Sequence, residues 1–145
     1  MENFILPIQL RWSDMDPNFH LRHSVYYDWG ALCRIEFLNK YGLTSDVMMK
    51  HQFGPILFRE ECIFRKEIRF GDNVTINLDL LKSKKDFSRW TIQHTIMKNG
   101  DTVSALLTVD GAWMDTLKRK LTLPPQEAII VFEEMHKGEN FQWID

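Results

Sequence analysis

The segment from Val25 to Leu38 constrains the fold more than any other part of the chain, because its apolar side chains point in nearly every direction when projected at the helical period. A helix that is apolar all round is normally buried. The segment is too short for a membrane span, and Asp28, Arg34 and Glu36 interrupt it. The sequence therefore predicts a core helix, ending near Lys40, that other parts of the chain wrap around.

Strand-like segments flank this helix on both sides. They occupy residues 4–12, 56–69, 74–82, 87–97 and 102–115. Residues 74–80, in the third of these, alternate between apolar and polar side chains, which is typical of a half-buried strand. Asn99-Gly100 between the last two is a strong hairpin signal. These patterns predict an α+β fold in which an antiparallel sheet of about five strands wraps around a long central helix.

The remaining segments complete a single domain over residues 1–145. Gly42 is expected to end the helix, and residues 43–54 form a connecting segment with room for one short helical turn. Pro124-Pro125 ends the strands, and residues 126–137 predict a short amphipathic helix. A sheet of this kind has an open face and free edges, so we expect a homo-oligomer, either a homodimer or a dimer of dimers.

Charge and cysteine content argue against several classes of protein. The net charge of -2 gives no overall basic field that would attract nucleic acid. The N-terminus has no basic region followed by a long apolar one, so we expect no signal or transit peptide, no membrane association and a cytoplasmic location. Cys33 and Cys62 lack the spacing of a metal site, so we expect two reduced core residues, with no metal and no cofactor.

The loop that leads into the helix carries the residues with the most chemistry. It places two acids and two histidines close together: Asp14, Asp16, His20 and His23. Backbone N–H groups and the helix dipole at this end of a helix favour developing negative charge. The combination is the outline of an acyl-transfer site.

The ordered motifs of the chain resemble the hot-dog-fold thioesterases, in the branch similar to 4-hydroxybenzoyl-CoA thioesterase. Asp14-Met-Asp16 resembles the DxD loop of that branch. His20 resembles the histidine of its GHxNN variant, and His23-Ser-Val-Tyr26 resembles its YHxxY-like variant. Later motifs that fit the family are Ala31–Leu38, Phe70-Gly71-Asp72, Asp115 and Leu123-Pro124. The chain departs from the pattern at Phe19, where a glycine is expected, and at Arg22-His23, where one variant has two asparagines.

The resemblance implies hydrolysis of an acyl-CoA thioester to a free acid and CoA. It implies that Asp16 is catalytic, as the nucleophile or as the general base for a water, while the helix N-terminus near His23 polarises the thioester carbonyl. His23 is the second catalytic candidate, as a donor to substrate or a partner of the acid. The predicted substrate-binding residues are His20, which mainly orients the loop, together with Arg22, Tyr26 and Phe19.

Each of these residues also has a structural explanation. Asp16 precedes Pro17, and Asp-Pro pairs favour turns. Asp14 is expected to cap the loop or to bond its amides. Arg22 is either a solvated charge or a contact to a ligand phosphate.

Glu60 is the third catalytic candidate. By alternation it shares a side of its strand with Ile56, Phe58, Cys62 and Phe64, which puts a carboxylate on an apolar face. Such an acid has either a paired cation, for example Arg34, or a catalytic role. His94 has apolar neighbours on its face and is expected to be a satisfied core histidine.

Two other functions fit the same scaffold. One is an acyl-carrier-protein thioesterase, whose acidic carrier would meet cationic turns. The other is a non-catalytic acyl-binding protein, in which Trp12, Trp29 and Phe19 line a pocket. Two cationic clusters are candidates to meet the phosphates of CoA: Lys82, Lys84, Lys85 and Arg89, and Arg65, Lys66 and Arg69.

Overall fold

A computed structural model of the chain describes residues 3–145, and its main feature is one seven-stranded sheet with a helix packed along one face. The strands are β1 (Phe4–Ile8), β2 (Phe53–Phe64), β3 (Val74–Lys84), β4 (Arg89–Lys98), β5 (Thr102–Asp115), β6 (Lys120–Thr122) and β7 (Lys137–Ile144). The helices are α1 (Val25–Lys40), α2 (Ser45–His51) and α3 (Gln126–Glu133), and Trp12–Asp14 forms a short 3₁₀ turn.

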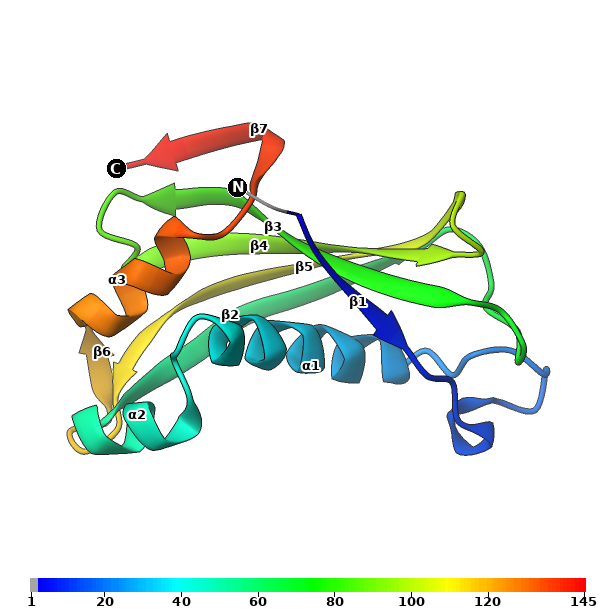
Figure 1. Cartoon of the computed structure of the whole chain (residues 1–145), viewed down its shortest axis with the longest axis horizontal. Coiled ribbons are helices and arrows are strands. Elements are labelled where there is room, and N and C mark those ends of the chain that lie inside the picture. Colours follow the sequence, from blue (N-terminus) through cyan, green and yellow to red (C-terminus); the bar gives the residue numbers. More distant parts are fainter. Residues whose placement is uncertain (1–2) are drawn as a thin grey trace.

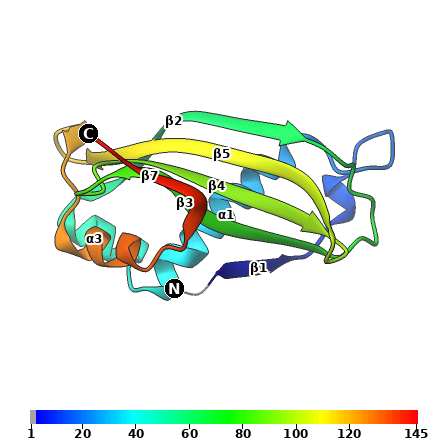
Figure 2. The same cartoon turned by 90° about the horizontal axis from the view of Figure 1, so that it is seen from above.

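Five strands form the main path of the sheet, in the order β1-β3-β4-β5-β2, and every pair along it is antiparallel. Seen from above, β2 and β1 lie at opposite edges and α1 lies behind the sheet (Figure 2). The predicted α+β fold, with an antiparallel sheet around a central helix, is confirmed. The helix spans 16 residues, so it is not long. Within residues 3–145, no helix has the length and apolar character that crossing a bilayer requires.

The turns follow the glycine signals in the sequence. Asn99 and Gly100 both have positive φ angles, of 55° and 79°, in the loop between the paired residues Lys98 and Thr102, so the predicted hairpin is confirmed. Gly42 has φ 92° and donates its N–H to the carbonyl of Asn39, while Leu43 donates to that of Leu38. This pair of hydrogen bonds is a Schellman motif, so the predicted helix end is confirmed.

Several predicted boundaries differ from the structure. The first strand after the helix ends at Phe64 rather than at residue 69, and the next two amides both donate to the carbonyl of Ser104. The connecting segment contains α2, which Thr44 caps through a hydrogen bond from the amide of Val47. The last helix ends at Glu133, and β7 follows it and runs parallel to β3.

The prediction that α1 is buried all round is wrong for the single chain. Its buried face comprises Val25, Tyr26, Trp29, Gly30, Cys33, Phe37 and Leu38. Asp28, Ala31 and Leu32 are exposed, because the sheet covers only one side of the helix. An apolar patch on α1 therefore remains uncovered in one copy of the protein.

A β-bulge in β2 overturns the predicted face of Phe58. The register with β5 shifts between Leu57 and Arg59, which inserts one extra residue into β2. Leu57 consequently faces α1, whereas Phe58 lies on the outer face of the sheet beneath the guanidinium of Arg89. Glu60 remains on the helix side of the sheet, where it meets Arg34.

Gly30 lets α1 approach the sheet closely. A Cβ atom at this position would lie 2.3 Å from Cδ2 of Leu107, which is fully buried in β5. A separation this short is a steric clash, and a fully packed leucine has no free space to move into. The glycine is therefore needed for close packing although it weakens the helix itself.

We predict that Gly30→Ala destabilises the protein by about 1–3 kcal/mol, because overpacking of the core outweighs the gain in helix propensity. Urea unfolding followed by circular dichroism measures the change in the free energy of unfolding. Asn39→Ala, on the exposed side of α1, is the control and should be neutral or slightly stabilising. A stabilised Gly30→Ala protein would contradict the close packing described here.

Candidate active site at the N-terminus of α1

The loop between β1 and α1 is fixed to the end of the sheet by backbone hydrogen bonds. Leu21 donates its N–H to the carbonyl of Ile68 over 2.7 Å, and His20 forms a β-bridge with Arg69. Within the loop, Asp16 donates its N–H to the carbonyl of His20 over 2.9 Å. These contacts give the loop one defined conformation beside the segment that follows β2.

Asp14 has the structural role predicted for it. Its side chain is buried and accepts hydrogen bonds from the backbone N–H of Arg11 over 3.0 Å and from the guanidinium of the same residue over 2.7 Å. The side-chain hydrogen bond from Arg11 is the main cause that lowers the pKa of Asp14 below its usual value. Asp14 is therefore a buried carboxylate that holds the loop together.

Asp16 combines a turn-forming role with a position at a cavity. Its Oδ1 accepts hydrogen bonds from the amides of Asn18, over 2.8 Å, and His20, over 3.4 Å. Its Oδ2 lies 3.6 Å from Nδ1 of His20. Phe19 adopts φ 66°, a left-handed conformation that favours glycine, which is the residue that the family resemblance led us to expect at this position. The side chain of Asp16 is only 25% exposed, so it does not project into bulk solvent.

A cavity of about 290 Å³ opens beside Asp16. Its lining comes from the loop, the start of α1, the end of β2 and the segment that follows β2, and it comprises Asp16, His20, Leu21, His23, Tyr26, Phe64, Arg65, Lys66 and Glu67. Four predicted site residues therefore share one cavity. The cavity also contains cations, because Arg65 and Lys66 form part of its wall.

His20 and Tyr26 give the cavity its fixed walls. His20 lies between two carboxylates, with Nε2 3.4 Å from Oε2 of Glu67 on the side opposite Asp16. Tyr26 is buried and packs edge-on against Phe64, with ring centroids 5.0 Å apart. Burial raises the pKa of Tyr26 to about 12, so the phenol keeps its proton at neutral pH.

The first turn of α1 has no side-chain cap. Ser24 occupies the N-cap position but makes no capping hydrogen bond, and its Oγ instead accepts a hydrogen bond from Arg22 over 2.7 Å. Uncapped amides at a helix N-terminus are preorganised donors for an anion. They lie at the same end of the helix as His23 and Tyr26, which line the cavity.

Three predicted site residues lie outside this cavity. Phe19 is 75% exposed, and Arg22 is engaged with Ser24. Glu60 lies further back along β2, where its Oε2 is 3.8 Å from Nη2 of Arg34, the structural pairing that the sequence favoured. The aromatic residues predicted to line a single acyl pocket are also separated, since Trp29 borders another cavity and Trp12 packs against Phe70.

A buried polar chain connects Arg34 to the sheet. Nη1 of Arg34 donates to Nε2 of His94 over 3.0 Å, and Nδ1 of His94 donates to the carbonyl of Asn77 over 2.8 Å. The ring is fully buried with both nitrogens bonded, which confirms the predicted satisfied core histidine. Burial is the main cause that lowers the pKa of His94 to about 3, and burial also lowers the pKa of Arg34.

His94 should make the protein less stable in mild acid. The folded state keeps this ring neutral down to about pH 3, whereas the unfolded chain binds a proton near pH 6.5. Because the unfolded state alone gains the proton between these values, stability is lost as the pH falls below 6.5. We predict that His94→Gln removes about 2 kcal/mol of the stability change between pH 7 and pH 5.

Urea unfolding at the two pH values checks this prediction by comparing differences in the free energy of unfolding. His23→Gln, at an exposed histidine, is the control and should keep the wild-type difference. An unchanged pH difference in His94→Gln would show that His94 is not the buried neutral group.

Sequence reasoning missed some members of the site. Arg65 and Lys66 were recognised as cations but not as neighbours of Asp16, and Glu67 was not singled out. The sequence did show that residues 65–67 are all charged, and in the structure they follow directly after β2. Their proximity to the β1–α1 loop, however, depends on how the chain folds in three dimensions. Among residues 3–145, no three or more histidine, cysteine, aspartate or glutamate side chains are placed so that they could hold a metal ion together.

Comparison with protein families identifies the fold and the class of enzyme. Residues 10–132 match the thioesterase-like superfamily. The chain belongs to this family. The match confirms the resemblance inferred from the sequence and the predicted class of enzyme, a thioester hydrolase. A comparison with curated proteins finds no match.

Solved structures of similar proteins confirm the hot-dog fold. A hypothetical protein from Staphylococcus aureus in complex with CoA is 17% identical, with a TM-score of 0.85 over 99% of this chain and 89% of that one. A 1,4-dihydroxy-2-naphthoyl-CoA thioesterase from Synechocystis is 15% identical, with a TM-score of 0.80 over 92% and 97%. A gentisyl-coenzyme A thioesterase is 20% identical, with a TM-score of 0.73 over 90% and 100%. At these identities the similarity establishes the fold alone.

Proposed function

We propose that the protein hydrolyses acyl-CoA thioesters to a free acid and CoA, with Asp16 as the catalytic carboxylate. The observation that carries this proposal is that one cavity brings together Asp16, the start of α1 and two cations. A thioester is an activated acyl group, so one carboxylate and one site that stabilises the oxyanion suffice for the chemistry. The solved relatives named for CoA or CoA esters support the choice of substrate.

The hydrogen bonds of Asp16 indicate which of its oxygens reacts. Oδ1 already accepts two backbone amides, which fix the orientation of the carboxylate. In one mechanism, Oδ2 attacks the thioester carbon and expels the thiolate, and water then hydrolyses the resulting mixed anhydride. In the other, Oδ2 removes a proton from the water that attacks the thioester carbon. The amides in the first turn of α1 stabilise the negative charge that develops on the carbonyl oxygen.

His20 and His23 have different roles in this scheme. His20 lies between two carboxylates and so orients Asp16 and the loop. His23 is exposed and lines the cavity, where it can donate a hydrogen bond to the substrate. The neutral phenol of Tyr26 and the ring of Phe64 form the apolar wall against which the acyl group packs.

The cations in the cavity favour the nucleotide end of CoA as their partner. Arg65 and Lys66 lie in the same cavity as Asp16, whereas Lys82, Lys84 and Arg89 line another cavity on the outer face of the sheet. Arg69 is engaged with Glu67 over 2.7 Å. Of the two cationic clusters in the sequence, the one at residues 65 and 66 is therefore the better candidate to meet the phosphates of CoA.

The proposed active form is a homodimer or a dimer of dimers. β2 lies at an edge of the sheet and is 12 residues long, so it has a row of backbone groups available for a further strand. The exposed apolar side chains of α1 and β2, including Leu32, Ile63 and Phe64, are the kind of surface that a second copy covers.

We predict that Asp16→Asn lowers kcat for acyl-CoA hydrolysis at least about 100-fold, because it removes the attacking or proton-accepting carboxylate. A thiol-release assay over a panel of CoA esters measures the loss. Asp28→Asn, at an exposed aspartate in the first turn of the same helix, is the control and should keep wild-type activity. Full activity in a folded Asp16→Asn protein would refute the assigned role.

We predict that Arg65→Ala combined with Lys66→Ala raises KM for acyl-CoA several-fold and leaves kcat nearly unchanged, because a contact to the phosphates is equally strong in ground and transition states. The matching acyl-pantetheine ester, which lacks the nucleotide, should show no change in KM. Lys82→Ala combined with Lys84→Ala is the control on the outer face. If only acyl-carrier-protein esters respond to the first pair, the carrier is the partner instead.

A further inference from the structure

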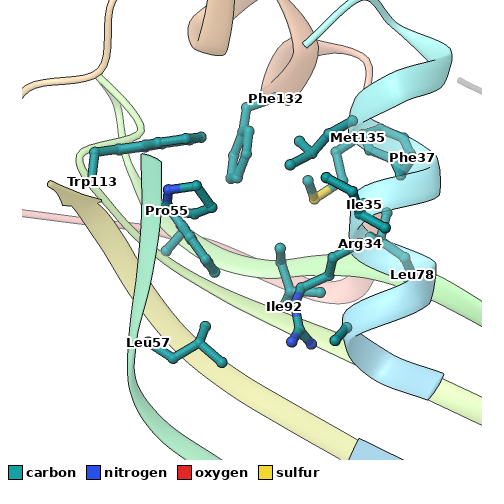
Figure 3. A pocket seen from close by; sticks show the side chains of 13 residues that line it. Arg34, Ile35, Phe37, Pro55, Leu57, Leu78, Ile92, Trp113, Phe132 and Met135 are labelled. Atoms are coloured by element: carbon teal, nitrogen blue, oxygen red, sulfur yellow. The ribbon is translucent and has the colours of Figure 1, made fainter. Parts of the chain in front are cut away.

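A second cavity lies between α1 and the sheet, toward the opposite end of the helix from Asp16. Its volume is about 220 Å³. Apolar side chains from α1, the sheet, α3 and the segment after α3 form nearly all of its wall: Ala31, Ile35, Phe37, Leu38, Pro55, Leu57, Leu78, Trp90, Ile92, Trp113, Phe132 and Met135. Arg34 is the one charged residue of the wall among residues 3–145, and it points from α1 into the space between helix and sheet, away from Trp113 and Phe132 (Figure 3).

This cavity is distinct from the site at Asp16. The two cavities have no lining residue in common. Tyr26 lines the cavity beside Asp16, and Arg34 lines the second cavity. The two residues are eight positions apart on α1 and so about 12 Å apart along the helix axis.

Arg34 is an incompletely paired cation in an apolar environment. Its hydrogen-bond partner is the neutral ring of His94, and the nearest carboxylate oxygen, on Glu60, is 3.8 Å away, which is too far for a hydrogen bond. The Arg34 side chain is only 15% exposed, and buried charges in proteins are normally paired with an opposite charge at hydrogen-bond distance.

We propose that this cavity binds a small monocarboxylic acid with an apolar body, whose carboxylate pairs with Arg34. A guanidinium offers parallel N–H donors that match a planar carboxylate. The apolar wall accepts a hydrocarbon or aromatic body, and within the described part of the chain it has no second cation to balance a doubly charged anion. The volume is below the range of about 300–1,000 Å³ that is usual for drug-sized ligands, which limits the acid to a small one.

Glu60 does not block this arrangement. Its side chain is 33% exposed and lies on the edge strand, so water can solvate its carboxylate when the ligand carboxylate takes the place beside Arg34. His94 keeps Arg34 in position from the other side, because its hydrogen bond to Asn77 fixes the ring. The proposal does not rest on thioester hydrolysis, and binding is measured without any turnover.

The test compares octanoate with octanamide by isothermal titration calorimetry on the intact protein. The two probes have the same apolar chain and differ in the charge of the head group. A charge-assisted hydrogen bond to Arg34 should make octanoate bind at least about tenfold more tightly than octanamide. No saturable octanoate binding, or equal affinity for the two probes, would overturn the proposal.

Two variants assign the binding to this cavity. Arg34→Met should remove the preference for octanoate while octanamide still binds, and a thermal melt checks that the variant is folded. Ala31→Phe fills the cavity from the exposed side of α1 and leaves the Arg34 side chain present, and it should abolish the binding of both probes. Asn39→Phe, at an exposed position of α1 outside the cavity lining, is the matched control and should bind both as the wild type does.

Asp16→Asn separates this proposal from the proposed function. Its octanoate affinity should equal that of the wild type, because the two cavities are distinct. If the preference for octanoate survives in Arg34→Met, or if Asp16→Asn abolishes it, the acid binds elsewhere and the proposed site is wrong. Loss of hydrolysis in Asp16→Asn with unchanged octanoate binding would support both proposals.

Discussion

Close packing of α1 against one face of the sheet positions the rest of the structure. The glycine at position 30 allows the contact with Leu107, and a few residues further on the side chain of Arg34 enters the interior and reaches His94. Because the ring of His94 is bonded in turn to the carbonyl of Asn77, a buried polar chain ties the helix to two strands. Apolar packing alone allows small shifts in register, whereas a chain of hydrogen bonds in a low-dielectric interior specifies one position.

The position of α1 against the sheet also determines which residues form the cavities near its two ends. At its N-terminus the β1–α1 loop is bonded to the segment after β2, and this arrangement brings Asp16, His23 and two cations into one cavity. Toward its C-terminus the bulge in β2 turns Leu57 toward the helix and helps to form the apolar cavity beside Arg34. Figure 1 shows the loop at one end of α1 and the helices α2 and α3 at the other. The helix α1 therefore has a polar cavity, beside Asp16, near its N-terminus and an apolar cavity farther along its length.

Much of the fold could be predicted because it follows from local patterns. The alternation of residues 74–80 identifies a strand with one buried side, and Gly42 and Asn99-Gly100 take the positive φ angles that only a few residue types adopt readily. The roles of Asp14 and His94 were also predictable, since buried polar groups need partners. The ordered motifs of the β1–α1 loop and the helix led to the correct family.

The sequence by itself determined the α+β fold, the central helix and the family, because each of these depends on periodicity, turn chemistry or motifs of residues adjacent in the chain. Only the tertiary structure decided that Arg65 and Lys66 join Asp16, and that the bulge places Phe58 and Glu60 on opposite faces. A one-residue insertion in a strand reverses which side each following residue faces, and no periodic pattern reports it. Contacts between distant segments likewise depend on how the strands pair and on where the helix lies against them.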